Sequence, residues 1–176
     1  MKSTQLVALF LIFLSSCTTK KITDYENGIL KFSGCPDGGD CNIEQIRDTQ
    51  INLERDDNGK LYPELKKSNT YHLYKITYNK QTDINLLADT EYQEIIYFEI
   101  EKSKTFRQFN NKALDRAKVT YGRLCRCPEE TGYEPIYDGK LYFETFRQVT
   151  EIKLEIIPKT LPVIMNNFQV KVAFND

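Results

Sequence analysis

The stretch Phe168-Gln169-Val170-Lys171-Val172-Ala173-Phe174 has an apolar residue at every even-numbered position, and Ala173 is its only apolar odd-numbered residue. Successive side chains of a β-strand point to opposite faces of the sheet. This alternation therefore predicts a strand with one face on a core and the other in water. The same period of two recurs over residues 152–156, 96–100 and 72–78. Half-buried strands of this kind are typical of antiparallel sheets.

Two dipeptides predict tight hairpins between such strands. Asn58-Gly59 and Asp138-Gly139 are typical of type I′ turns, which need a positive φ at both central residues. We therefore expect a strand ending near Leu53 to pair with one beginning at Leu61. By the same argument, residues 133–137 should pair with residues 141–146.

Residues 104–118 interrupt the alternation. Apolar residues recur there at roughly helical spacing, which leaves a short helix and an irregular loop both open. Tyrosine, phenylalanine and β-branched residues otherwise fill the periodic segments, as is common in sheets. We predict an all-β fold, an antiparallel sandwich or bent barrel of about seven or eight strands. A single sheet with one helix packed on it is the alternative.

The N-terminus carries an export pattern. Lys2 precedes an apolar run from Leu6 to Leu14, which is too short to span a bilayer comfortably and is typical of a signal peptide. The run ends in Leu14-Ser15-Ser16-Cys17, which resembles the lipobox of bacterial lipoproteins. The resemblance implies that Cys17 is diacylated and becomes the first residue of the mature chain. Two acyl chains hold a protein stably on a membrane.

This interpretation divides the chain into a signal peptide (1–16), a flexible tether (17–28) and a single β-rich domain (29–176). Thr18 follows the lipid-bearing cysteine, and in bacterial lipoproteins a non-acidic residue there favours the outer membrane. We expect a bacterial cell-envelope location with the membrane as the first partner. Loss of Lys2 changes the formal charge from −1 to −2. Neither a basic patch nor an acidic tail is visible, so no nucleic-acid partner is expected.

Four further cysteines, Cys35, Cys41, Cys125 and Cys127, suggest two disulfides in an exported protein. If residues 120–127 form a strand, Cys125 and Cys127 lie about 7 Å apart on one face, too far to bond without distortion. We therefore predict that each bonds across to Cys35 or Cys41. Such a crosslink, across about 90 residues, would contribute about 4 kcal/mol of stability. The competing pattern pairs Cys35 with Cys41 and Cys125 with Cys127.

Other chemistry has weaker support in the sequence. The cysteine spacings are not those of common zinc sites. A thiol catalyst could use Arg126 to lower a thiolate pKa, but no thioredoxin-like βαβ pattern is present. His72, the only histidine, falls on a strand, and no Gly-x-Ser-x-Gly elbow exists. Carboxylate pairs such as Glu99 and Glu101 are expected in turns or on the wet faces of strands. We assign no catalytic residue, metal or cofactor.

The loop from Arg126 to Tyr137 combines an arginine, two tyrosines, a glycine and two prolines. Rigid loops of this composition serve recognition, so Arg126, Tyr133 and Tyr137 are binding candidates. A wide hairpin connection is the plainer interpretation. The pattern Gly-Arg-x-Cys-x-Cys…Thr-Gly-Tyr, with the upstream Cys…Gly-Gly-x-Cys turn, resembles small lipoproteins of Bacteroidota over most of the mature chain. That resemblance implies no particular activity.

We predict a lipid-anchored envelope domain with a non-catalytic, structural or ligand-binding role. One alternative is an inhibitor or protein-binding factor that presents residues 126–137 to a secreted partner. Another is an envelope enzyme that uses thiols or carboxylates.

Overall fold

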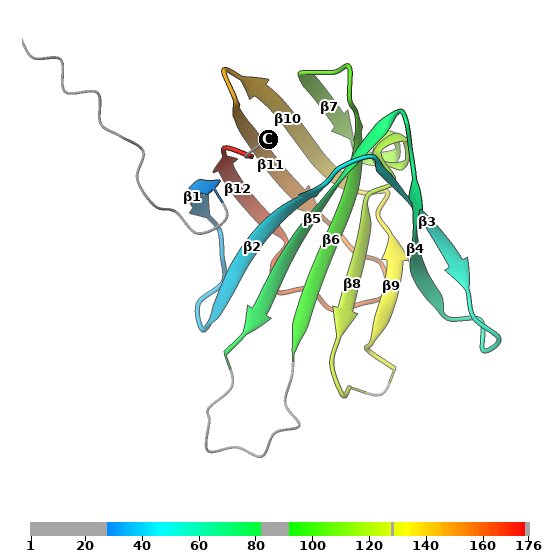
Figure 1. Cartoon of the computed structure of the whole chain (residues 1–176). Coiled ribbons are helices and arrows are strands. Elements are labelled where there is room, and N and C mark those ends of the chain that lie inside the picture. The colour runs from blue at the N-terminus through cyan, green and yellow to red at the C-terminus, as the bar shows by residue number, and fades with distance from the viewer. Residues whose placement is uncertain (1–27, 82–91, 128, 175–176) are drawn as a thin grey trace, which may run out of the picture.

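A computed structural model describes residues 28–81, 92–127 and 129–174, which form an antiparallel β-sandwich (Figure 1). The predicted signal peptide, Cys17 and nearly all of the predicted tether lie outside these residues. No helix in the described ranges is long and apolar enough to cross a membrane. The elements are β1 (Ile29–Ser33), β2 (Gly39–Ile46), β3 (Thr49–Arg55), β4 (Leu61–Lys67), β5 (Tyr71–Lys80), β6 (Gln93–Glu101), β7 (Phe106–Asn110), the 3₁₀ helix η2 (Asn111–Ala117), β8 (Thr120–Leu124), β9 (Gly132–Pro135), β10 (Gly139–Phe146), β11 (Val149–Ile156) and β12 (Asn167–Val172).

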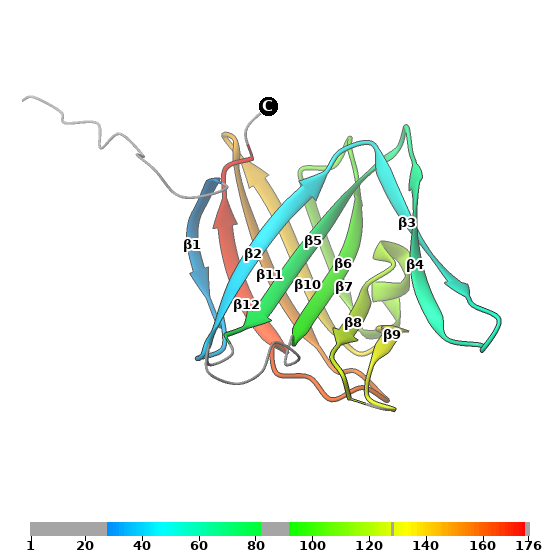
Figure 2. The same ribbon diagram turned by 60° about the horizontal axis from the view of Figure 1, so that its bottom comes forward.

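Two five-stranded sheets make up the sandwich. One has the order β1-β12-β11-β10-β7 and the other β2-β5-β6-β8-β9, and they are not closed into a barrel. The β3–β4 hairpin projects from the second sheet (Figure 2). The all-β prediction is confirmed, but twelve strands replace the expected seven or eight. Several of the extra strands have only four or five residues, too few for a period of two to be read from the sequence.

The main core lies between the sheets and confirms the alternation in the C-terminal strand. Phe168, Val170 and Val172 are all buried there, and facing residues of the other sheet complete the packing. The largest fully buried side chains of this core are Tyr78, Tyr121, Phe98, Phe143, Ile43, Ile76, Ile96, Leu114, Ile136 and Leu141. Leu114 and Ala117 come from η2, so the short helix is the one of the two open alternatives that forms. However, it is a 3₁₀ helix, and residues 106–110 before it form β7.

A second apolar cluster buries the outer face of β6. Ile51 of the β3–β4 hairpin packs there with Leu73, Ile95 and Tyr97. The expectation that Glu99 lies on a wet strand face is therefore wrong, since only 3% of Glu99 is exposed. Its carboxylate accepts the Ile51 backbone N–H at 3.2 Å, which ties the hairpin to the sheet. The alternation in β6 marked one buried face but could not show that a hairpin covers the other.

One of the two predicted hairpins forms. β3 pairs with β4, with Arg55 opposite Leu61, so residues 56–60 connect the two strands. The predicted type I′ turn is wrong, because Gly59 has a positive φ and Asn58 does not. The second prediction is wrong, because β9 pairs with β8 and β10 pairs with β11 and β7. The chain crosses from one sheet to the other at Gly139, where φ is 137°. A Cβ there would lie 2.0 Å from the Glu155 carbonyl oxygen, so this glycine permits a close backbone approach rather than a hairpin turn.

Candidate functional site

A pocket of about 430 Å³ opens between the two sheets at one end of the sandwich. The β2–β3, β6–β7 and β10–β11 turns and the end of β12 gather at this end (Figure 2). We call it the mouth pocket. Its lining residues are Gln45, Arg47, His72, Tyr74, Ile100, Glu101, Lys102, Lys104, Thr105, Phe143, Thr145, Gln148, Thr150 and Phe174. Both sheets contribute, so the pocket exists only in the assembled sandwich.

Aromatic rings form the floor of the mouth pocket. The Tyr74 ring lies 5.2 Å from the Phe143 ring and 5.7 Å from the Phe174 ring, both at steep angles. Gln45 Nε2 donates a hydrogen bond of 2.8 Å to the Tyr74 hydroxyl. Burial raises the pKa of Tyr74 to about 12, so this phenol stays protonated across the physiological range. The floor is thus an uncharged apolar surface with one polar edge.

The rim of the mouth pocket is cationic. Arg47, Lys102 and Lys104 line it together with a single carboxylate, Glu101. Arg107 Nη2 lies 3.3 Å from Glu101 Oε2 and offsets that carboxylate. Lys102 forms an ion pair with the neighbouring Asp48. An excess of positive charge therefore remains, and it favours a negatively charged ligand group at the rim.

His72 lies in the same wall as a neutral acceptor. The Asp48 backbone N–H donates to His72 Nδ1 at 3.1 Å. Burial and the positive charge of Lys102 lower the pKa of His72 from its usual 6.5. The hydrogen bond from Asp48 fixes the orientation of the His72 ring in the pocket wall.

Strained backbone surrounds the mouth pocket. Arg147 and Gln148 form the two-residue turn between β10 and β11 with φ values of 47° and 69°. Asp48, beside Arg47, has a φ of 53°. A left-handed conformation costs a non-glycine residue roughly 1–2 kcal/mol, and such strain concentrates at functional sites. The turn places Gln148 in the pocket wall despite that cost.

The three predicted binding residues of the 126–137 loop lie elsewhere, and none of them lines the mouth pocket. Arg126 is exposed. Tyr133 is half-buried against its own sheet, where a Cβ on Gly122 would lie 2.3 Å from the Tyr133 ring. Tyr137 is 37% exposed, and Lys159 Nζ lies 5.7 Å from the centre of its ring. Tyr133 is therefore a packing residue, which leaves Arg126 and Tyr137 as the accessible side chains.

The predicted cross-segment disulfides are wrong. Cys35 bonds to Cys41 and Cys125 bonds to Cys127, which is the competing pattern. The prediction failed because it continued the strand through Cys127. β8 ends at Leu124, and in the bend that follows the Cα atoms of Cys125 and Cys127 are 5.2 Å apart.

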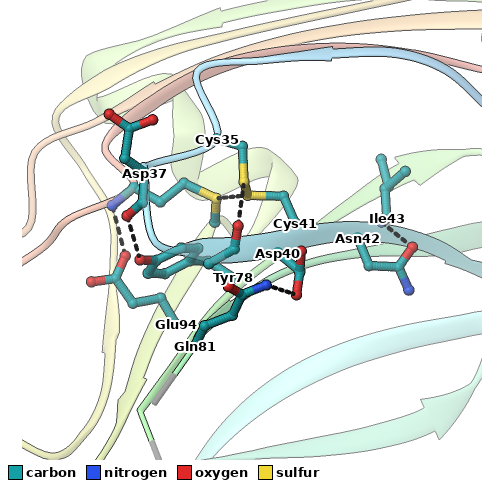
Figure 3. The surroundings of a disulfide bond; sticks show 11 residues. Cys35, Asp37, Asp40, Cys41, Asn42, Ile43, Tyr78, Gln81 and Glu94 are labelled. Atoms are coloured by element: carbon teal, nitrogen blue, oxygen red, sulfur yellow. Dashed lines mark hydrogen bonds between the residues drawn. A yellow bond between two sulfur atoms is a disulfide. The ribbon is translucent and has the colours of Figure 1, made fainter. Parts of the chain in front are cut away.

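The Cys35–Cys41 bond closes the turn before β2, as Figure 3 shows. Next to it, the Tyr78 hydroxyl donates to the Asp37 carbonyl at 3.5 Å, and Gln81 Nε2 donates to Asp40 at 3.0 Å. This bond therefore staples a turn onto the adjoining strand instead of joining distant segments.

The sequence analysis considered His72 only as a strand residue, and it missed the mouth pocket as a site. The pocket draws single residues from many segments, and no short motif spans them. Neither residue of the Arg147-Gln148 turn is the glycine or asparagine that would mark a left-handed turn.

Among the described residues, no group of three or more histidine, cysteine, aspartate or glutamate side chains could hold a metal ion. No protein-family model, curated protein or solved structure matches the chain.

Proposed function

We propose that this protein is a lipid-anchored, non-catalytic domain of the bacterial cell envelope that binds a small amphiphilic anion in the mouth pocket. The observation that carries the proposal is the pairing of an aromatic floor with a cationic rim in one concavity. Its volume of about 430 Å³ is within the usual range for small-molecule sites. The apolar body of such a ligand would pack on the rings, and its carboxylate or sulfonate would face Lys104 and Arg47.

Neutral polar groups provide further contacts. The Thr145 and Thr150 hydroxyls lie 3.0 Å apart on neighbouring strands and can each donate or accept. The Gln148 side-chain amide also lines the pocket and carries both a hydrogen-bond donor and an acceptor. A few placed polar groups over an apolar floor are typical of sites that fix a ligand's orientation.

The test uses 8-anilinonaphthalene-1-sulfonate, an aromatic sulfonate, as the probe and follows its fluorescence under native conditions. Lys104→Glu should weaken binding about tenfold, the effect of reversing one charge some 6 Å from an anion in water. Lys60→Glu is the matched control, because Lys60 is also an exposed turn lysine but lies in the β3–β4 hairpin. Equal affinity of the two variants for the probe would overturn the proposal.

The anchor is proposed on the lipobox-like sequence that ends at Cys17. Metabolic labelling with an alkyne analogue of palmitate should mark the wild-type chain in its host. Cys17→Ser should remove the label and release the protein from the membrane fraction. Sucrose-gradient fractionation should place the labelled wild type in the outer membrane. A labelled Cys17→Ser variant would refute lipidation at this residue.

A protein-binding role for residues 126–137 is the second candidate. The exposure of Arg126 and of part of Tyr137 favours it. Pull-down from envelope extracts should then recover one partner that is lost with Arg126→Ala and Tyr137→Ala together. Tyr133 should be left intact, since its ring packs on Gly122. A partner retained by the double variant would refute this role.

A further inference from the structure

Cys125 and Cys127 form a disulfide with a single residue between them, in the bend after β8. Both cysteines are only half-buried, so a thiol from solution can approach. Closing so short a loop removes little conformational freedom from the reduced chain. A bond with little entropic advantage and an accessible sulfur is more readily reduced than a buried structural one.

The Arg123 guanidinium lies beside Cys127. Arg123 Nη2 lies 4.0 Å from Cys127 Sγ, and only 12% of the Arg123 side chain is exposed. The guanidinium lies over the Tyr92 ring at 5.2 Å, and its Nε and Nη1 atoms have no hydrogen-bond partner among the described residues. Glu130 pairs with Nη2 at 3.1 Å, but it is half-exposed to water. A thiolate at Cys127 would therefore gain a charged donor that is already in place.

We propose that Cys125–Cys127 is a redox-exchangeable disulfide that accepts two electrons from a dithiol, with Cys127 as the leaving thiolate. A substrate thiolate attacks Cys125 Sγ, the Cys125–Cys127 bond breaks, and the electron pair goes to Cys127 beside Arg123. The second substrate thiolate then attacks the substrate sulfur of the mixed disulfide and releases Cys125 as a thiolate. The products are an oxidised substrate and a reduced Cys125/Cys127 pair, and each of these thiolates takes up a proton. A low-molecular-weight disulfide can restore the bond by the reverse exchange.

The other disulfide supplies an internal control. Cys35 and Cys41 are half-buried like the other pair, but they enclose a longer loop and pack against the main core. Among the described residues, their sulfurs contact the Gly39 carbonyl and the Met165 Sδ, the latter 3.8 Å from Cys41 Sγ, and not a charged donor. We expect this bond to stay oxidised under conditions that open Cys125–Cys127.

The experiment equilibrates the folded protein in glutathione buffers of graded ratio and labels free thiols with two isotopic alkylating reagents. Peptide mass spectrometry then reads each disulfide separately. Where half of Cys125–Cys127 is reduced, more than nine-tenths of Cys35–Cys41 should remain oxidised. Simultaneous reduction of the two bonds, or earlier reduction of Cys35–Cys41, would overturn the proposal.

The role of Arg123 is tested in a Cys125→Ser background by the pH dependence of Cys127 alkylation. The charged groups of the bend and its flanks are Arg123, Arg126, Glu129 and Glu130. From the neighbouring β6 side, Glu94 lies opposite Arg123 and the Tyr92 ring packs on the guanidinium. The alkylation midpoint should lie below 8.5, the ordinary cysteine value. Glu130→Gln should lower the midpoint further, and Arg123→Gln should raise it. If Arg123→Gln does not fold, Glu130→Gln serves as the test. An alkylation midpoint of Cys127 that rises or stays unchanged in Glu130→Gln would refute stabilisation of the thiolate by the Arg123 guanidinium.

Discussion

The loop between β11 and β12 is held by a buried carboxylate, and replacing it by an amide should destabilise the fold. Glu94 on β6 is fully buried. Its Oε1 accepts the Ile164 backbone N–H and its Oε2 the Met165 backbone N–H, each at 2.8 Å. The Tyr92 hydroxyl donates a third hydrogen bond to Oε1. Glu94→Gln keeps the size of the side chain but turns one of the two acceptor oxygens into a donor.

The magnitude follows from these three bonds. In the amide, an NH₂ group faces one of the backbone N–H donors. Leaving a buried donor without a partner costs roughly 1–3 kcal/mol, and the remaining two bonds lose the extra strength of a charged acceptor. We expect Glu94→Gln to lower the free energy of unfolding by about 3 kcal/mol. With a urea slope of about 2 kcal/mol/M, typical of a domain of this size, the midpoint should fall by roughly 1.5 M.

The assay is urea unfolding followed by far-ultraviolet circular dichroism, with the slope compared between variants. Glu44→Gln is the matched control, because Glu44 is an exposed glutamate on a strand of the same sheet. Its free energy of unfolding should change by no more than about 0.5 kcal/mol. A loss below about 1 kcal/mol in Glu94→Gln, at an unchanged slope, would refute the view that this carboxylate secures the loop.

Three further predictions concern the turns and the pH dependence. The lowered pKa of His72 means that the unfolded chain binds its proton first as the pH falls below 6.5. The free energy of unfolding should therefore fall as the pH drops below 6.5, and the urea midpoint should fall with it. In His72→Gln the urea midpoint should change less with pH over this range. A pH dependence equal to that of the wild type would contradict the assignment. Replacing Arg147-Gln148 by Asn-Gly should raise the free energy of unfolding by about 1 kcal/mol, because those residues accept a positive φ readily. A lower urea midpoint would argue against backbone strain there. Cys35→Ala with Cys41→Ala should cost about 2 kcal/mol, as expected for so short a loop, and a loss near 4 kcal/mol in thermal or urea unfolding would count against this local pairing.

Some of the fold could be predicted because it depends on local pattern. The alternation at Phe168, Val170 and Val172 describes a strand with one buried face, and such a strand is what forms. The pairing of β3 with β4 around Asn58-Gly59 is equally local, although the connection is longer than the predicted two-residue turn. The identical logic failed at Gly139, where contact with Glu155 of another strand determines the conformation. A positive φ can serve a hairpin or a close crossing, and the sequence does not distinguish them.

The candidate site depended more heavily on tertiary structure. Glu99 looks like a wet-face residue in a period-two strand, whereas Glu94 falls on the same face as Ile96 and Phe98. Each carboxylate is buried because a distant segment offers its backbone N–H groups. The mouth pocket likewise combines Tyr74 of one sheet with Phe143 of the other. The predicted strand ran through Cys127, but β8 ends three residues earlier, at Leu124, and this difference made the predicted disulfide pairing wrong. These errors share one cause: partners remote in the chain determine local burial and backbone course.

The start of β1 has a consequence for orientation. The Gly28 carbonyl accepts the Ala173 backbone N–H at 2.8 Å, and Phe174, the next residue, lines the mouth pocket. Gly28, the first described residue, therefore lies at the open end of the sandwich beside the end of β12 (Figure 1). Eleven residues separate Cys17 from Gly28, and a fully extended chain of that length reaches about 40 Å. If Cys17 carries lipid, the mouth pocket can therefore lie no more than about one domain diameter from the membrane surface.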